Sequence, residues 1–265
     1  MDLHLAGHTA VVTGGASGIG LATARAFAAE RCALHLWDRD PGVGGVARRL
    51  ADEFDLLAVG TVVDITDSDA VRRAADAAGA VDHVVHCAAV GSGKFGFPFT
   101  NLTPADWPRV LNVNILGTVN VAHALAPRMV EAKWGTFVFL ASVAGQIGSP
   151  TDPPYSASKA ANINFAQCMA KDLAKHGVRV NTVCPGMVQT PLNRAVWQAW
   201  HDQAAEGERL SYEEWAGRKV RDVVPLGKWQ TPDDIAAMIV FLSSDRAAAV
   251  TGQTVNVDGG FVMHW

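Results

Sequence analysis

Short runs of β-branched and other apolar residues alternate with longer alanine-rich segments along most of the chain. This alternation is typical of units in which a crossover helix joins two parallel strands. The runs are apolar on both faces, as expected of strands that helices cover on two sides. The segments predicted to be strands are residues 9–13, 33–37, 57–63, 81–86, 135–140, 178–183 and 253–257. We therefore expect an α/β fold with a doubly wound parallel sheet of about seven strands flanked by helices.

The same pattern predicts long helices over residues 19–30, 107–130 and 155–176. No repeat or low-complexity linker divides the 265 residues, a length that an α/β sheet protein commonly folds as one domain. Residues 191–225 break the alternation with three tryptophans and many charges. A connection of that length in a compact domain is often functional. The prediction is a single domain, residues 1–265, with a substrate lid at about residues 191–225.

Composition and charge argue against several classes of partner. The 22 Lys and Arg residues against 26 Asp and Glu give a formal net charge of −4. Because the basic residues form no runs, nucleic acid is not expected as a partner. The N-terminus has no basic segment leading into an apolar one, and no uncharged apolar stretch reaches the roughly 18 residues of a spanning helix. We expect a soluble, cytoplasmic protein without a membrane partner.

The four cysteines have no CxxC spacing and no paired framework; they are Cys32, Cys87, Cys168 and Cys184. They are predicted to be reduced residues of the core, with metal ligation as the alternative. No metal site is expected.

A glycine-rich turn, residues 14–20 with the sequence GGASGIG, joins the first predicted strand to the first predicted helix. Glycine at 14, 18 and 20 removes β-carbons that would keep a diphosphate away from the backbone. The helix that follows offers free N–H groups and the positive end of its dipole. In this context the turn predicts a Rossmann-like dinucleotide site. The alternative is a tight turn that needs glycine for its geometry alone.

Asp38 ends the second predicted strand, about 20 positions beyond the turn. A carboxylate there is placed to accept hydrogen bonds from the adenosine ribose and to repel a 2′-phosphate. NAD is therefore expected as the cofactor rather than NADP. Arg39 weakens this preference, because an arginine nearby can hold a 2′-phosphate. Asp38 could otherwise be a helix cap within residues 38–41.

Tyr155 and Lys159 are four residues apart on a predicted helix, so their side chains share a face. An ammonium beside a phenol favours the phenolate and lowers a pKa that starts at about 10. That shift suits a general acid–base group. Ser142, at the end of the fifth predicted strand, would donate a hydrogen bond to the same substrate oxygen. A Tyr-x-x-x-Lys pair is common by chance, but Tyr155 and Tyr212 are the only tyrosines in the chain.

Taken together, these motifs resemble those of the short-chain dehydrogenase/reductase family over nearly the whole chain. They fall in family order and at family spacing. The matching residues are Thr13-Gly14-x-x-x-Gly18-Ile19-Gly20, Asp64, Asn114, Ser142, Tyr155-x-x-x-Lys159, Pro185-Gly186, Thr190 and Asp258-Gly259-Gly260. The resemblance implies a single-domain, NAD-dependent oxidoreductase that interconverts a secondary alcohol and a ketone. It also implies a homotetramer.

The family resemblance completes a catalytic set of Asn114, Ser142, Tyr155 and Lys159. In this set Asn114 holds a water molecule that relays protons through Lys159. The alternative for Asn114 is a helix-interior asparagine bonded to its own backbone. A catalytically idle relative that binds a dinucleotide is a second alternative for the whole chain, and a dehydratase or epimerase is a third.

For the cofactor, the resemblance implies that Asp64 meets the adenine. Thr190 and the Val188 backbone would lie near the nicotinamide carboxamide. The cofactor-binding residues predicted from the turn, from Asp38 and from the resemblance are Gly14, Ser17, Gly18, Ile19, Gly20, Asp38, Asp64, Ile65, Ala88, Tyr155, Lys159, Pro185, Gly186, Val188 and Thr190.

Residues 86–89 depart from the family pattern. Family members usually read Asn-Asn-Ala-Gly after the fourth strand, where this chain reads His-Cys-Ala-Ala. Ala88 keeps the small residue that close approach needs, but the hydrogen bonds of the asparagines must come from other groups. His86 could supply some of them. The departure bears on local cofactor contacts more than on the chemistry.

The substrate is predicted to be a sugar, a polyol or a related hydroxylated small molecule. Gln146 can both donate and accept hydrogen bonds, Lys94 brings a cation, and Trp197 offers a face that can stack on a sugar ring. Ser142 and Tyr155 complete this predicted substrate set. The alternative is an apolar slot for a hydrophobic or aromatic alcohol, lined by Trp197 with Trp200 and Phe95.

Overall fold

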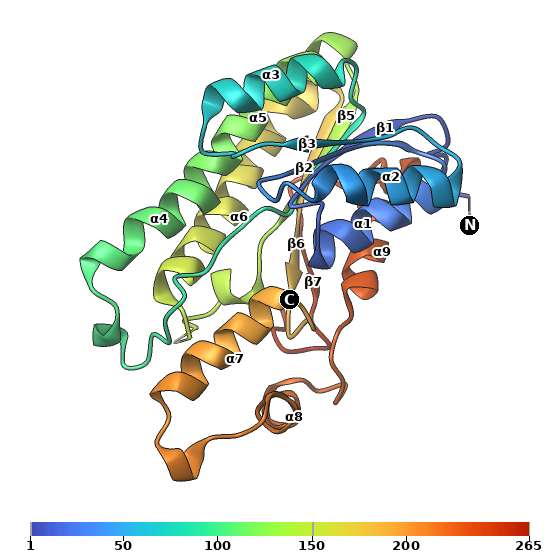
Figure 1. The fold of residues 1–265 in the computed structure, drawn as a ribbon. Helices are drawn as coiled ribbons and strands as arrows, with labels where there is room; N and C mark the ends of the chain where they lie inside the picture. Colours follow the sequence, from blue (N-terminus) through green and yellow to red (C-terminus); the bar gives the residue numbers. More distant parts are fainter. Residues whose placement is uncertain (1, 150, 265) are drawn as a thin grey trace.

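A seven-stranded parallel sheet forms the centre of the computed structural model, which describes residues 2–149 and 151–264 (Figure 1). The strand order is β3-β2-β1-β4-β5-β6-β7. The strands are β1 Thr9–Thr13, β2 Ala33–Asp38, β3 Ala58–Val62, β4 His83–His86, β5 Gly135–Leu140, β6 Val178–Pro185 and β7 Thr254–Val257. The predicted fold, one Rossmann-like domain with seven strands, is confirmed, and no strand end differs from the prediction by more than two residues.

Helices cover both faces of the sheet (Figure 1). One face carries α1 Gly18–Ala29, α2 Val43–Phe54 and α9 Pro232–Ser243. The other face carries α3 Ser68–Ala78, α5 Gly117–Ala132 and α6 Pro153–Leu173. This three-layer arrangement explains why the strands are apolar on both sides.

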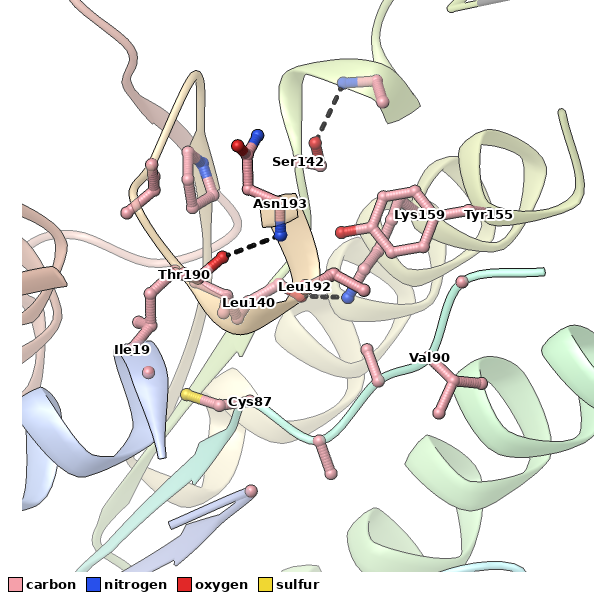
Figure 2. A pocket seen from close by; sticks show the side chains of 18 of the residues that line it. Ile19, Cys87, Val90, Leu140, Ser142, Tyr155, Lys159, Thr190, Leu192 and Asn193 are labelled. Atoms are coloured by element: carbon pink, nitrogen blue, oxygen red, sulfur yellow. Dashed lines mark hydrogen bonds between the residues drawn. The ribbon is translucent and has the colours of Figure 1, made fainter. Parts of the chain in front are cut away.

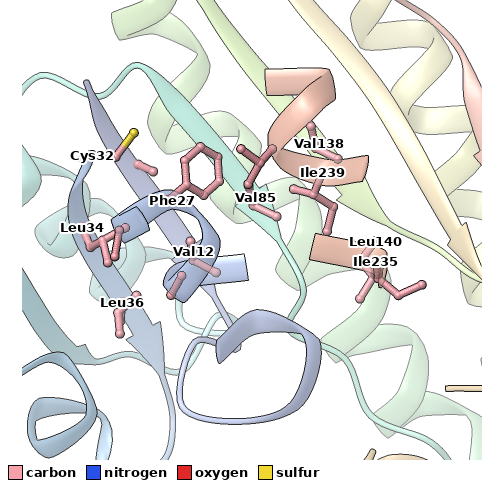
Figure 3. Close-up of a cluster of buried hydrophobic side chains, with 14 of the residues drawn as sticks. Val12, Phe27, Cys32, Leu34, Leu36, Val85, Val138, Leu140, Ile235 and Ile239 are labelled. Atoms are coloured by element: carbon pink, nitrogen blue, oxygen red, sulfur yellow. The ribbon is translucent and has the colours of Figure 1, made fainter. Parts of the chain in front are cut away.

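The core beneath α1 and α9 fixes the start of α1. In Figure 3, Phe27 of α1 and Ile239 of α9 lie over the central strands beside Val12 and Val85. All four side chains are fully buried. Burial of each such side chain stabilises the fold by about 1.5–3 kcal/mol. The turn that precedes α1 is therefore held firmly at the carboxyl edge of the sheet.

Strands β1 and β4 are neighbours in the sheet although β2 and β3 lie between them in the sequence. The order of strands reverses at this pair, and open α/β sheets bind ligands outside the carboxyl ends at such a switch point. Gly14 and Ala88 follow the two strands. A β-carbon on Gly14 would lie 2.9 Å from the Ala88 nitrogen, and the φ of Gly14 is +68°. Only glycine fits this close approach.

The predicted helix over residues 107–130 is longer and less regular than expected. It consists of α4 Trp107–Leu111, a π-helical segment Asn112–Leu116, and α5. π-helical segments are frequent at functional sites, and this one contains Asn114. One inserted residue leaves the apolar spacing almost unchanged, so the sequence pattern does not reveal it.

This helical region also meets the length and hydropathy criteria of a membrane-crossing helix. Residues Pro104–Ala132 include a window with a mean hydropathy of 1.2, of which 39% is buried inside the fold. This window was not identified from the sequence, because the criterion applied there required a stretch without charged residues. A helix that flanks a buried sheet passes the same criteria, so this single helix is weak support for membrane contact. The absence of a membrane partner stays a prediction.

Residues 191–225 form two helices, α7 Pro191–Gln203 and α8 Tyr212–Val223, which lie together beyond the carboxyl edge of the sheet (Figure 1). Aromatic rings hold them against each other. The Tyr212 ring lies 5.8 Å from that of Trp197, and Trp200 lies 6.3 Å from Trp215. Both tryptophans that the sequence assigned to a substrate, Trp197 and Trp200, thus pack α7 on α8.

The cysteines are only partly core residues. Cys32 and Cys184 are buried and Cys87 is half-buried, whereas Cys168 is exposed on α6. The prediction of four core cysteines is therefore wrong for Cys168, because its helix turns that position away from the sheet.

Candidate active site

A cavity of about 1190 Å³ opens at the carboxyl edge of the sheet. The glycine turn, the ends of the central strands, the first turns of α6 and parts of residues 191–225 line it. Figure 2 shows Ile19, Ser142, Tyr155 and Thr190 around this space. Every residue that the sequence predicts for the cofactor lies in its wall. Of the predicted catalytic set, Ser142, Tyr155 and Lys159 line the cavity, and Asn114 lies behind it.

The glycine turn is shaped to admit a phosphate group. A β-carbon on Gly20 would lie 2.1 Å from the Gly14 carbonyl oxygen, so the turn closes only with glycine there. Ser17 caps α1 by its backbone, and its side chain makes no capping hydrogen bond. The first N–H groups of α1 therefore face the cavity without a side-chain partner, as anion binding at a helix N-terminus requires. These residues fit the diphosphate of a dinucleotide.

Asp38 is held in place at the end of β2. Its Oδ2 accepts a hydrogen bond of 3.0 Å from the Ala16 backbone, and its Oδ1 accepts one of 3.0 Å from the Asp40 backbone. Each carboxylate oxygen keeps a lone pair for a further donor. Asp38 lines the cavity beside Arg39, so both residues that bear on the choice between NAD and NADP are present at its wall.

Asp64 lies on the same side of the cavity. Its carboxylate accepts hydrogen bonds from the Thr66 backbone and hydroxyl at 2.9 and 2.7 Å. These bonds, and next the positive charge of Arg39, hold the pKa of Asp64 below its usual value. The charge of Arg39 is thus partly compensated within the protein.

His86 bridges the centre of the sheet. Its Nδ1 lies 2.9 Å from the Thr13 hydroxyl and its Nε2 lies 3.0 Å from the Thr118 hydroxyl. The Thr118 hydroxyl donates to the Asn114 carbonyl oxygen, so it must accept from His86 Nε2–H, and Nδ1 is the acceptor. Burial lowers the pKa of His86 to about 3, which keeps the ring neutral. His86 thus supplies hydrogen bonds where the family pattern has asparagine.

Tyr155 is placed by the start of α6. Asp152 caps this helix: its Oδ1 accepts a hydrogen bond of 3.4 Å from the Tyr155 backbone, and Pro153 occupies the first helical position, where proline is favoured. One turn later, Lys159 lies on the same face, with its Nζ 5.5 Å from the Tyr155 ring centroid. Burial lowers the pKa of Lys159 to about 8.

The pKa of the Tyr155 phenol differs from the expectation. Burial raises it, the Asp152 carboxylate raises it further, and a hydrogen bond with Ser142 opposes both. The Lys159 ammonium donates a 2.7 Å hydrogen bond to the Leu140 carbonyl oxygen. Because this bond draws the ammonium toward β5, its charge does not offset the desolvation of the phenol. The predicted lowering of the Tyr155 pKa is therefore not found in the protein by itself.

The Asn114 side chain is already fully engaged. Its Nδ2 donates to the Val90 carbonyl oxygen and to the Ser158 hydroxyl, both at 2.9 Å, and its Oδ1 accepts from the Val90 backbone at 2.8 Å. Asn114 thereby ties the loop after β4 to α6. The predicted water-holding role would have to fall to its backbone, because both amide hydrogens are used.

Three predicted substrate contacts point elsewhere. Within the described residues, the cavity wall includes none of them. Lys94 pairs with Asp106 at 2.8 Å. Gln146 donates to the Asn256 side chain at 2.8 Å, and the Trp197 indole donates to a backbone carbonyl at 3.1 Å. The Lys94 ammonium, the Gln146 amide nitrogen and the Trp197 indole N–H are therefore bound within the protein.

Other side chains take their place in the wall. Asp152, Asn193, Trp215 and Lys219 line the cavity. The sequence indicated Asn193 as a polar residue of the lid, but it did not indicate Asp152, Trp215 or Lys219. Asp152 could have been found from the helix-start signal Asp-Pro-Pro before Tyr155. No comparable signal exists for Trp215 and Lys219, because their positions depend on how α8 packs.

Similarity to known proteins agrees with this geometry. Residues 14–262 match a family model described as enoyl-(acyl carrier protein) reductase. D-threitol dehydrogenase of Mycolicibacterium smegmatis is 33% identical over 267 residues, which cover 99% of this chain and 95% of that protein. The similarity therefore spans the turn, the catalytic residues and residues 191–225.

Two solved structures share the fold over their whole length. A 3-oxoacyl-(acyl-carrier protein) reductase from Brucella melitensis with bound NAD is 31% identical, with a TM-score of 0.82 over 99% of this chain and 95% of that one. L-sorbose reductase from Gluconobacter frateurii, complexed with NADPH and L-sorbose, is 26% identical, with a TM-score of 0.89 over 100% of both chains. The chain therefore belongs to the short-chain dehydrogenase/reductase family and is an oxidoreductase of alcohols and ketones that uses a nicotinamide dinucleotide.

Proposed function

We propose that this enzyme is an NAD(H)-dependent dehydrogenase/reductase that interconverts a secondary alcohol and a ketone on a hydroxylated small molecule. The observation that carries the proposal is the convergence of Tyr155, Ser142 and Lys159 in one wall of the cavity whose opposite end is the glycine turn. The cofactor, when bound, accepts or donates the hydride. The protein's own groups hold the cofactor, move a proton and orient the substrate.

Tyr155 carries the proton in this proposal. Its phenol is protonated at neutral pH, because burial raises its pKa, so it can donate a proton to the carbonyl oxygen of a ketone. In the oxidation direction it must first lose that proton. The Lys159 ammonium on the same helix face would favour the phenolate, although in the protein by itself this charge does not outweigh the burial of the phenol. Ser142, which lowers the Tyr155 pKa by its hydrogen bond, would also stabilise charge on the substrate oxygen.

Asp38 supports NAD over NADP. A fixed carboxylate at the end of β2 can accept the two ribose hydroxyls and repels a 2′-phosphate. Arg39 would favour NADP, but its charge lies close to that of Asp64. The relatives include proteins crystallised with NAD and with NADPH, so the choice rests on these three side chains. Asp64 and Ile65 would meet the adenine end.

Residues 191–225 are proposed as the substrate lid. Leu192 and Asn193 of α7 and Trp215 of α8 line the cavity, so any movement of these helices would change access to it. Polar groups at the wall, Asn193 and Ser149 among them, support a hydroxylated substrate such as a sugar or polyol. The relatives named D-threitol dehydrogenase and L-sorbose reductase act on such compounds.

A second candidate is a hydrophobic or aromatic alcohol. Val196, Val223 and Phe261 also line the cavity, and they could receive an apolar group. A site that hydrogen-bonds hydroxyls rejects compounds without them, because its polar groups would go unpaired. A panel of polyols, sugars, steroids and aryl alcohols, with NAD and with NADP, separates the candidates. If steroids or aryl alcohols exceed every sugar and polyol tenfold in kcat/KM, the hydroxylated substrate is excluded.

We further propose a cytoplasmic homotetramer. The Leu116 side chain on the outer helices is 55% exposed and Met263 near the C-terminus is 73% exposed, as expected of surface that another subunit covers. Part of the apolar tail already packs, since Phe261 and Val262 contact the small cluster around Val143. Trp265, also in the predicted apolar tail, lies outside the described residues. Light scattering at the 28.0 kDa mass of one chain would exclude the assembly.

A further inference from the structure

Lys219 on α8 is a cation in the cavity wall that has no carboxylate partner. It lines the cavity beside Trp215, one helical turn earlier. Its Nζ lies 4.2 Å from the centroid of the Trp215 ring, an arrangement that favours the charged ammonium. Within residues 2–149 and 151–264, no carboxylate oxygen lies within 4.0 Å of this nitrogen.

The other cations of the cavity wall are Arg39, Arg109 and Lys159, and each has a carboxylate nearby or a carbonyl acceptor. The first lies close to the Asp64 carboxylate. The second donates a 2.7 Å hydrogen bond to the Gly91 carbonyl oxygen and lies near Asp152. The third donates to a carbonyl oxygen at the end of β5. Among the described cations of the wall, Lys219 alone has neither a nearby carboxylate nor a carbonyl acceptor.

Burial also acts on the Lys219 ammonium. It lowers the pKa of the ammonium to about 8, and no neighbouring acid opposes the shift. The Lys219 ammonium is half-buried, with only an aromatic ring beside it. A bound anion would stabilise its charged form. Val223, one turn further along α8, and Phe261 also line the cavity, and both are apolar and offer an anion no second cation.

We propose that Lys219 binds a monoanionic group of the substrate, a carboxylate, away from the reacting carbon. A single ammonium neutralises one negative charge, whereas a phosphate dianion would leave a net charge in this partly apolar wall. The substrate class is thus a hydroxylated acid or its keto acid. This inference rests on the proposed function, because it assigns the same cavity to the substrate.

The first test compares keto acids with their neutral amides. The pairs are 3-oxobutanoate and 3-oxobutanamide, 4-oxopentanoate and 4-oxopentanamide, and 5-oxohexanoate and 5-oxohexanamide, each with NADH. In wild type, the acid of at least one pair should exceed its amide tenfold in kcat/KM, about 1.4 kcal/mol. Lys219→Gln should bring the ratio of acid to amide within twofold of one, and Lys219→Arg should retain the preference for the acid.

Arg218→Gln is the matched control, because Arg218 is exposed on the same helix and outside the cavity wall. It removes the same charge and should leave the ratio of acid to amide unchanged. A comparison of kcat/KM for glycerone phosphate and for glycerone tests whether the site prefers a phosphate dianion. A Lys219-dependent preference for the phosphate that exceeds the preference for every carboxylate would overturn the choice of a monoanion.

A binding measurement separates this inference from the proposed function. Calorimetry of 4-oxopentanoate and its amide with the enzyme–NAD complex needs no turnover, because oxidised cofactor cannot reduce a ketone. Suppose that the acid binds more tightly than the amide, that Lys219→Gln abolishes this difference, and that the enzyme reacts with no alcohol or ketone of the full panel. That outcome would reject the proposed function and keep the anion site. Equal binding of acid and amide in wild type, or binding of neither, would overturn the inference.

Discussion

The two ends of the cavity differ in what holds their side chains. At the cofactor end, the residues follow directly on strands β1, β2 and β4, and backbone geometry places them: Gly14 fits only as glycine, and two backbone hydrogen bonds hold Asp38. At the substrate end, the residues lie on α7 and α8, where aromatic packing places them. The first arrangement can be inferred from spacing along the chain, and the second depends on tertiary packing.

The largest effect on catalysis is expected at Tyr155, in the part of the cavity wall that the strands and α6 form. Tyr155→Phe removes the proton donor and leaves the ring, so kcat should fall by about 10²–10⁴-fold. Cofactor affinity, measured by fluorescence titration with NADH, should remain within a few-fold of wild type. A variant that keeps a tenth of the wild-type kcat would exclude Tyr155 as the acid–base group.

Cofactor choice should depend on Asp38 at the end of β2. The ratio of kcat/KM with NAD to that with NADP should be about tenfold or more in wild type, on the order of 1.4 kcal/mol. Asp38→Ala should narrow this ratio, because the 2′-phosphate would no longer meet a carboxylate. Better activity of the wild type with NADP would mean that Arg39 dominates.

Stability in acid should depend on His86 beneath the cofactor end. Its pKa is lowered to about 3 in the fold, below the usual value of about 6.5. The unfolded chain therefore binds a proton that the fold excludes between pH 6.5 and 3, and the unfolding free energy falls as the pH falls through this window. His83, also lowered to about 3, acts in the same direction.

The change His86→Asn isolates the contribution of His86. For one such histidine, the unfolding free energy falls by about 1.4 kcal/mol for each pH unit within the window. Urea titrations at pH 6.5 and 5.5 should therefore show a smaller loss in His86→Asn than in wild type, with His83 unchanged in both proteins. An identical loss would show that the ring is not buried neutral.

The smallest effect is expected at Gln146, which the sequence assigned to the substrate. Its amide bonds to Asn256 within the protein, so Gln146→Ala should change kcat/KM by less than twofold. The unfolding free energy should fall by about 1 kcal/mol for the lost hydrogen bond. A tenfold rise in KM with unchanged stability would return Gln146 to the substrate site.

The fold could be predicted from the sequence because strand runs and glycine spacing are local signals. Tyr155 and Lys159 were recoverable for the same reason, since positions four apart share a helix face. The engagement of Asn114 with Val90 and Ser158 was not recoverable, because it joins three segments and a π-helical turn. Lys94 and Gln146 were assigned by polarity alone, and their partners Asp106 and Asn256 decide their orientation.

The central claim is that the enzyme transfers a hydride between NAD and a secondary alcohol with Tyr155 as the acid–base group. The most direct measurement follows reduced-cofactor absorbance for wild type and Tyr155→Phe over polyols, sugars, hydroxy acids, steroids and aryl alcohols, each with NAD and NADP. We predict that wild type reduces NAD with at least one hydroxylated compound and that Tyr155→Phe loses this activity at least 100-fold. The claim would be contradicted if wild type bound NAD in calorimetry yet reduced it with no alcohol, and oxidised NADH with none of the matching ketones.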